Sequence, residues 1–117
     1  MYQEFTVPDD QEILDALGEW PEVDEGGSAR LLKLPGGEDG DVLLSYDSLS
    51  QSVRVRWINP AGEQILDLFR EGATKMSVTT TANSTSIALE FRLGEHNGEI
   101  NIQISPHLAI TDRILFV

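Results

Sequence analysis

The sequence of 117 residues contains no cysteine, which excludes both a disulfide framework and a thiolate metal site. It also lacks long hydrophobic runs: the longest is the four residues from Ile114 to Val117, whereas a membrane-spanning helix needs roughly 20. The chain begins Met-Tyr-Gln-Glu, without the basic and apolar regions of a secretory signal. These absences predict a soluble protein of the reducing cytoplasm that does not associate with membranes.

Basic residues are scarce. The chain has 8 Lys and Arg residues against 20 Asp and Glu residues, and its formal net charge is −12. This balance argues against binding nucleic acid or anionic lipid through a basic surface. The charge is also uneven: residues 1–47 hold 13 acids and 2 bases, a net charge of −11, whereas residues 48–117 hold 7 acids and 6 bases, a net charge of −1. The acidity therefore belongs to the first 47 residues.

Catalytic and ligand-binding motifs are missing as well. There is no Gly-x-Ser-x-Gly nucleophile elbow and no Gly-x-x-x-x-Gly-Lys phosphate loop. His96 and His107 have no second histidine or carboxylate at a ligand spacing, and the acidic turn at residues 38–41 lacks the ligand pattern of an EF-hand. We therefore predict no metal, no cofactor and no enzymatic activity.

The clearest structural signal is the alternation of apolar and polar residues between Ser86 and Ile104. The apolar positions are Ile87, Leu89, Phe91, Leu93, Ile100, Ile102 and Ile104. Asn97-Gly98 lies between the two runs and tolerates the positive φ angles of a type I′ turn. The pattern predicts a long β-hairpin with one apolar face that turns at Asn97-Gly98.

Residues 9–20 form the best helix candidate. Asp9 can cap the first turn, Glu12 is its capping-box partner, and Gly18 is a suitable terminator. The apolar stripe of this helix consists of Ile13, Leu14, Leu17 and Trp20. We expect Trp20 to dock into the core with this stripe; the alternative is that Trp20 anchors an interface.

The remaining strand candidates are Ala29–Leu34, Asp41–Tyr46, Ser52–Ile58, Lys75–Thr80 and Ile110–Val117. Residues 64–70 allow a strand or a helix, because Asn59-Pro60-Ala61-Gly62 can form a type I turn with a glycine bulge or cap a helix; we favour the hairpin. The chain is thus predicted to be one α+β domain over residues 1–117. It would be an antiparallel β-meander of about seven strands with one N-terminal helix packed on one face.

Two groups of charged residues have a functional and a structural interpretation. Arg54 and Arg56 share one strand face, where they could grip an anionic ligand, but we expect them to provide solubility and to pair with acids across strands. The acidic run at residues 9–25 is either a solvated surface or a docking surface for a basic partner. The candidate partner-binding residues are Glu12, Asp15, Glu19, Glu22, Asp24 and Glu25.

A small, cysteine-free, acidic α+β chain without a catalytic constellation resembles the immunity proteins that bacteria make against polymorphic or contact-dependent growth-inhibition toxins. The resemblance covers the size and charge of the whole chain. It implies a cytoplasmic, non-enzymatic inhibitor that binds a cognate toxin domain, often a basic nuclease, so that carboxylates occupy the positive surface meant for phosphates. The alternative is a small β-sheet module that binds an apolar ligand or a peptide strand at a sheet edge.

Overall fold

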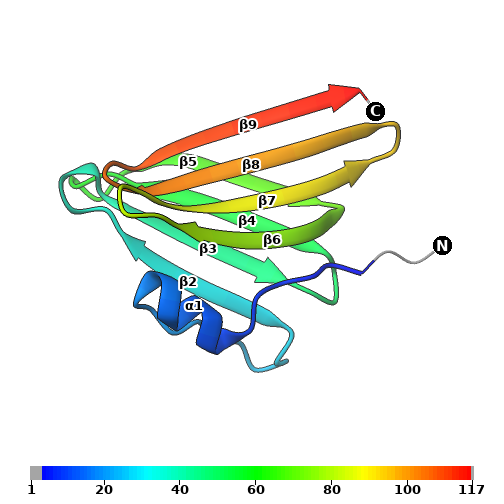
Figure 1. The fold of residues 1–117 in the computed structure, drawn as a ribbon, viewed down its shortest axis with the longest axis horizontal. Helices are drawn as coiled ribbons and strands as arrows, with labels where there is room; N and C mark the ends of the chain where they lie inside the picture. Colours follow the sequence, from blue (N-terminus) through cyan, green and yellow to red (C-terminus); the bar gives the residue numbers. More distant parts are fainter. Residues whose placement is uncertain (1–3, 117) are drawn as a thin grey trace.

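The computed structural model describes residues 4–116 and contains two antiparallel sheets with one short α-helix (Figure 1). The five-stranded sheet has the order β1-β2-β3-β4-β5, and the four-stranded sheet has the order β6-β7-β8-β9. The elements are α1 (Asp10–Leu17), β1 (Glu22–Val23), β2 (Ala29–Pro35), the 3₁₀ turn η1 (Gly37–Asp39), β3 (Asp41–Asp47), β4 (Ser52–Ile58), β5 (Gln64–Glu71), β6 (Ala73–Thr80), β7 (Thr85–Leu93), β8 (His96–Ser105) and β9 (Ala109–Phe116).

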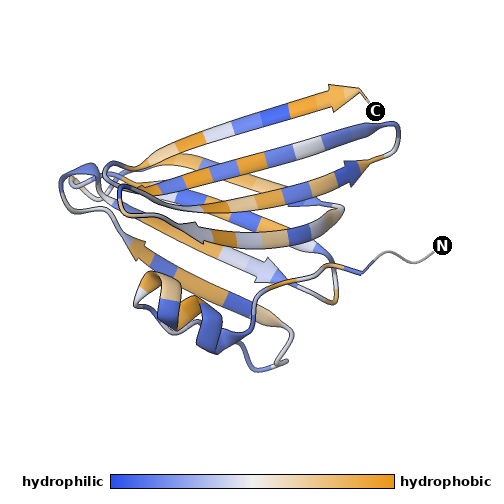
Figure 2. Ribbon diagram, in the orientation of Figure 1, coloured by the Kyte–Doolittle hydropathy of each residue, from blue (hydrophilic) through white to orange (hydrophobic). Residues whose placement is uncertain are grey.

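The prediction of a single meander is wrong, because the two sheets cover each other's apolar faces. Hydrophobic residues alternate with hydrophilic ones along the strands (Figure 2). One core cluster contains inward residues of both sheets, such as Leu44 and Val55 from the five-stranded sheet and Leu89 and Ile100 from the other. A period of two places these side chains on one face of each strand, and two such faces exclude water from one another.

The chain passes from the first sheet to the second at Gly72, between β5 and β6. Gly72 has a φ angle of 86°, and an added Cβ would lie 2.7 Å from the carbonyl oxygen of Arg92. Its own carbonyl accepts a hydrogen bond of 2.9 Å from the Arg92 N–H. This close approach of backbones requires glycine, and it places β6 beside β7 rather than beside β5.

The central hairpin is confirmed, but its predicted turn is wrong. Leu93 pairs with His96, so the two turn residues are Gly94 and Glu95, and Asn97 and Gly98 lie inside β8. Gly94 has a φ angle of 64°, as the first central position of a type II′ turn requires. The observed register places Ile100 opposite Leu89, whereas a turn at Asn97-Gly98 would place Ile100 opposite the carboxylate of Glu95.

The hairpin interpretation of residues 59–70 is confirmed. Gly62 has a φ angle of 86° and donates its N–H to the carbonyl of Asn59, with a distance of 2.9 Å. The Asn59 side chain accepts the N–H of Glu63 at 2.9 Å, and a register shift between Trp57 and Ile58 of β4 precedes the turn. Residues 64–70 therefore belong to strand β5 and not to a helix.

Helix α1 lies beside β2 and contacts β6, at the side of the two sheets rather than over the centre of one face (Figure 1). Ile13 is completely buried there. Trp20 lies beyond the end of the helix and is 54% exposed, so its predicted docking into the core is wrong. Among the residues described here, none belongs to a helix long and apolar enough to cross a membrane.

Candidate functional site

The acidic segment at residues 9–25 begins with a well-formed helix start. Asp9 is the N-cap of α1, and its side chain accepts a hydrogen bond of 2.8 Å from the N–H of Glu12. Gly18 ends the helix in the left-handed conformation and donates its N–H to Leu14. Both caps were predicted from the sequence. The Asp9 carboxylate therefore has a structural role at the start of the helix.

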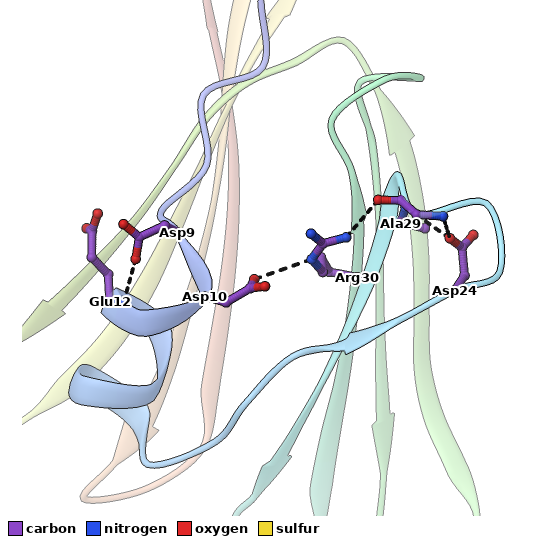
Figure 3. A network of polar contacts seen from close by, with 7 residues as sticks. Asp9, Asp10, Glu12, Asp24, Ala29 and Arg30 are labelled. Atoms are coloured by element: carbon purple, nitrogen blue, oxygen red, sulfur yellow. Dashed lines mark hydrogen bonds and ion pairs between the residues drawn. The ribbon is translucent and has the colours of Figure 1, made fainter.

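Arg30 of β2 connects the helix to the loop that follows it (Figure 3). Its Nε donates to Asp10 Oδ1 at 3.3 Å, and its Nη1 donates to the carbonyl of Gly27 at 2.9 Å. The Arg30 and Asp10 side chains are both 27% exposed, so the pair is largely shielded from water. The arginine thus neutralises one of the acids and fixes α1 against the edge of the five-stranded sheet.

Asp24 organises the loop between β1 and β2. Its Oδ1 accepts the N–H of Gly27 at 2.8 Å and that of Ala29 at 3.4 Å (Figure 3). This pattern, an aspartate that binds backbone N–H groups a few residues onward, stabilises turns. The turn brings Ala29 and Arg30 into β2, so Asp24 has a structural role in addition to the predicted role in docking.

The other five candidate residues remain available to a partner to different degrees. Glu12 and Asp15 are exposed on α1, Glu25 is exposed in the loop, and Glu19 is half-buried just after the helix. Within residues 4–116, no cation forms a salt bridge with these four. Glu22 pairs with Lys33 at 3.3 Å, but both side chains are about 60% exposed, so water screens the pair.

A small cavity of about 250 Å³ lies between the start of α1 and strands β2 and β3, lined in part by Asp10, Arg30 and Tyr46. The Tyr46 hydroxyl is buried and has no hydrogen-bond partner within the described chain. Burial, and then the negative charge of Asp10, raise the pKa of Tyr46 to about 12. Tyr46 is therefore neutral at physiological pH and adds no charge to the acidic segment.

Two apolar residues of the acidic segment are exposed: Trp20, for which an interface was the alternative to core docking, and Val23, which the sequence analysis missed. Trp20 and Val23 are 54% and 52% exposed, and they flank the buried Pro21 and the carboxylate of Glu22. The sequence contained a signal for Trp20, because Gly18 ends the helix before the apolar stripe could reach it. The segment is thus an acidic surface that also exposes two apolar side chains.

Of the two arginines on β4, Arg54 matches the structural interpretation, whereas Arg56 does not: its Nε is buried without a hydrogen-bond partner within residues 4–116. Arg54 donates two hydrogen bonds to Asp67 of β5, with distances of 2.9 and 2.7 Å, and this pair lies exposed on the outer face of the sheet. The hydrogen bonds to Arg54 hold the pKa of Asp67 below its ordinary value. Within residues 4–116, no group of three or more histidine, aspartate or glutamate side chains could hold a metal ion.

The comparisons with known proteins rest on structure rather than on sequence. No protein-family model matches the chain, and no curated protein matches its sequence. One chain of a contact-dependent growth inhibition toxin–immunity protein complex from Klebsiella pneumoniae 342 has the same fold, with a TM-score of 0.83. The similarity covers 98% of this chain and 100% of that chain at 18% sequence identity. The fold is therefore one that occurs in a toxin–immunity complex.

Proposed function

We propose that this chain is a cytoplasmic immunity protein, a non-enzymatic inhibitor that neutralises a cognate toxin domain by direct binding. The supporting observation is the acidic segment on this fold. Residues 9–25 hold eight carboxylates and no lysine or arginine, and five of the six candidate docking residues have no salt-bridge partner within the described chain. The proposal is also supported by the fold, which this chain shares with one chain of a toxin–immunity complex.

The charge favours the inhibitor over the toxin as the role of this chain. A nuclease toxin must attract phosphates, whereas a chain with a net charge of −12 repels them. An inhibitor of a basic nuclease gains from the same charge, because opposite surface potentials raise the association rate and disfavour wrong partners. The proposed partner is therefore a basic toxin domain of the nuclease type.

The test uses the toxin domain encoded next to this chain's gene, purified and titrated against the protein in a surface-binding assay. We expect a tight complex whose association rate falls steeply as the salt concentration rises. Asp15→Lys should lower the association rate several-fold, and the triple variant Glu12→Lys, Asp15→Lys, Glu19→Lys should lower it further. The melting temperature of Asp15→Lys should stay the same or rise, since Glu12 and Asp15 repel one another on the helix surface.

The matched control is Glu95→Lys, which makes the same charge change in the exposed turn between β7 and β8. It should leave the association rate close to that of the unaltered protein. If the triple lysine variant binds as fast and as tightly as the unaltered protein, the acidic segment is not the docking surface. If the neighbouring toxin domain does not bind at all, the immunity function itself is refuted.

A second candidate function is supported by β9, an edge strand whose outer side pairs with no strand of residues 4–116. Ile114 and Leu115 point to opposite faces there and are 54% and 61% exposed. A free edge flanked by apolar side chains suits the addition of a peptide strand. In that case Leu115→Lys would abolish capture of the partner, while Asp15→Lys would leave it unchanged.

A further inference from the structure

A shallow groove crosses the outer face of the five-stranded sheet, on the side that faces away from β6–β9. It consists of two adjoining hollows of about 270 and 210 Å³, which share Ala29 of β2 and Ser45 of β3 as their floor. Ser45 points outward because its neighbours Leu44 and Tyr46 are buried in the core, and Ala29 lies on the same face because its cross-strand partner is Asp47, two residues from Ser45. The groove exists because the floor positions carry small side chains between larger ones.

An exposed apolar side chain stands at one end of this groove. It is Phe69 of β5, which is 64% exposed, whereas Glu22 of β1, the cross-strand partner of Leu31, lies at the other end. Leu31 lines the wall between them. An aromatic side chain at the end of a hollow with a small-residue floor is typical of the buried centre of a protein interface.

The charges around the groove indicate the kind of partner that fits it. Asp24 and Asp47 lie next to the floor: Asp24 Oδ1 accepts the N–H of Ala29, and Asp47 is the cross-strand partner of Ala29. Both carboxylates are held by backbone N–H groups rather than by cations. The two arginines that line the groove, Arg30 and Arg54, are already paired with Asp10 and Asp67.

The charge state of Asp47 is fixed by its local hydrogen bonds. Desolvation acts to raise the pKa of Asp47, but the N–H groups of Ser50 and Leu49 outweigh it and lower the pKa. Asp47 is therefore ionised at neutral pH. The groove consequently offers apolar surface and unneutralised negative charge together.

We propose that the toxin domain seats an extended segment in this groove, with an apolar side chain against Phe69 and a basic side chain near Asp24 and Asp47. This inference rests on the proposed function and assigns its contact surface. The inference also assigns different roles to the α1 acids and to the groove. The exposed acids of α1 accelerate the encounter from the rim of the contact, and the groove holds the bound partner. Charges at the rim mainly change association rates, whereas contacts in the centre change dissociation rates.

The experiment compares two matched substitutions in the purified protein. Ser45→Tyr fills the groove, while Ser77→Tyr places the same side chain on the outward face of β6, at another half-buried serine. Tyrosine is well tolerated in strands, so both variants should keep the melting temperature of the unaltered protein. Phe69→Ala is a third variant, which removes an exposed anchor without adding bulk. The probe is the toxin domain encoded next to this chain's gene, and both rate constants are measured.

The proposal requires that Ser45→Tyr and Phe69→Ala raise the dissociation rate on the order of 30-fold or more, the effect of losing a central contact. Their association rates should change little, and Ser77→Tyr should behave as the unaltered protein does. Unchanged dissociation from Ser45→Tyr and Phe69→Ala overturns the groove while the immunity function stands. Failure of the unaltered protein to bind the toxin domain overturns both.

Discussion

Arg70 of β5 and Asp112 of β9 join the edges of the two sheets through a pair of parallel hydrogen bonds, with N–O distances of 2.7 and 2.6 Å. The guanidinium carbon of Arg70 also lies 5.2 Å from the ring centroid of Phe91. The two charged side chains are 17% and 33% exposed, so water screens them only in part. The pair thus connects the two sheets between one edge strand of each.

Asp112→Asn should therefore destabilise the protein by about 1–2 kcal/mol, between the values for exposed and buried pairs. The variant keeps the shape of the side chain but removes the negative charge that Arg70 faces. Chemical denaturation measures the change in the free energy of unfolding. Asp67→Asn is the control, because its pair with Arg54 is exposed, and its loss should be clearly smaller. Equal losses in the two variants would contradict the partial shielding of Arg70 and Asp112.

The same pair predicts how stability depends on pH. The hydrogen bonds from Arg70 hold the pKa of Asp112 below its ordinary value of 3.8, against an opposing effect of desolvation. A carboxyl with a lowered pKa in the folded state stabilises the fold above its unfolded pKa, and this contribution is lost as the pH falls through the folded pKa. The difference in stability between the unaltered protein and Asp112→Asn should shrink between about pH 5 and about pH 1. Thermal melts across this range measure it, and a constant difference would contradict the ionic contribution.

The turn of the β7–β8 hairpin gives a test of register. Gly94 has positive φ, so Gly94→Ala should cost about 1–2 kcal/mol. Asn97 is exposed inside β8, and its side chain accepts only a long hydrogen bond of 3.3 Å from Arg92, so Asn97→Ala should cost little. Chemical denaturation of the two variants distinguishes the registers. A larger loss in Asn97→Ala would instead place the turn at Asn97-Gly98.

The sequence predicted what depends on neighbouring residues. The alternation of Val53 and Val55 identified β4, and Asp9 and Gly18 identified both ends of α1, because periodicity and caps act within a few positions. The choice between one sheet and two depends on contacts between distant residues, such as that between Arg70 and Asp112, which leave no local pattern. The turn at Gly94 was missed for a related reason. Asn97-Gly98 is the stronger local turn signal, but the register is set by the pairing of Ile100 with Leu89, which places the turn at Gly94.

The sequence predicted the candidate site only as a cluster of acidic residues. The sequence showed that residues 9–25 are acidic, but it did not show that Asp24 would be used to build a turn. Nor did it show the groove over Ala29 and Ser45, whose lining residues come from several separate strands, β1 to β5. Small side chains such as these carry no signal until the sheet assembles, so an interface built on them is found only in the fold.

Substitution of Trp20 should change binding without changing stability, because Trp20 is an exposed aromatic side chain within the acidic segment. Tryptophan is enriched among the residues that dominate binding energy, and acids around it would attract a basic partner to its position. Trp20→Ala should leave the melting temperature within a few degrees of the unaltered protein, since the residue lies outside the helix and is more than half exposed. Its affinity for the toxin domain should fall on the order of 30-fold.

The matched control for Trp20→Ala is Leu49→Ala, at an apolar residue in the turn between β3 and β4 that is 75% exposed. Both substitutions remove exposed apolar surface, but only Trp20 belongs to the acidic segment. Leu49→Ala should therefore bind the toxin domain as the unaltered protein does. A large fall in the melting temperature of Trp20→Ala would show that Trp20 supports the core after all. Equal affinity of the two variants would remove Trp20 from the docking surface.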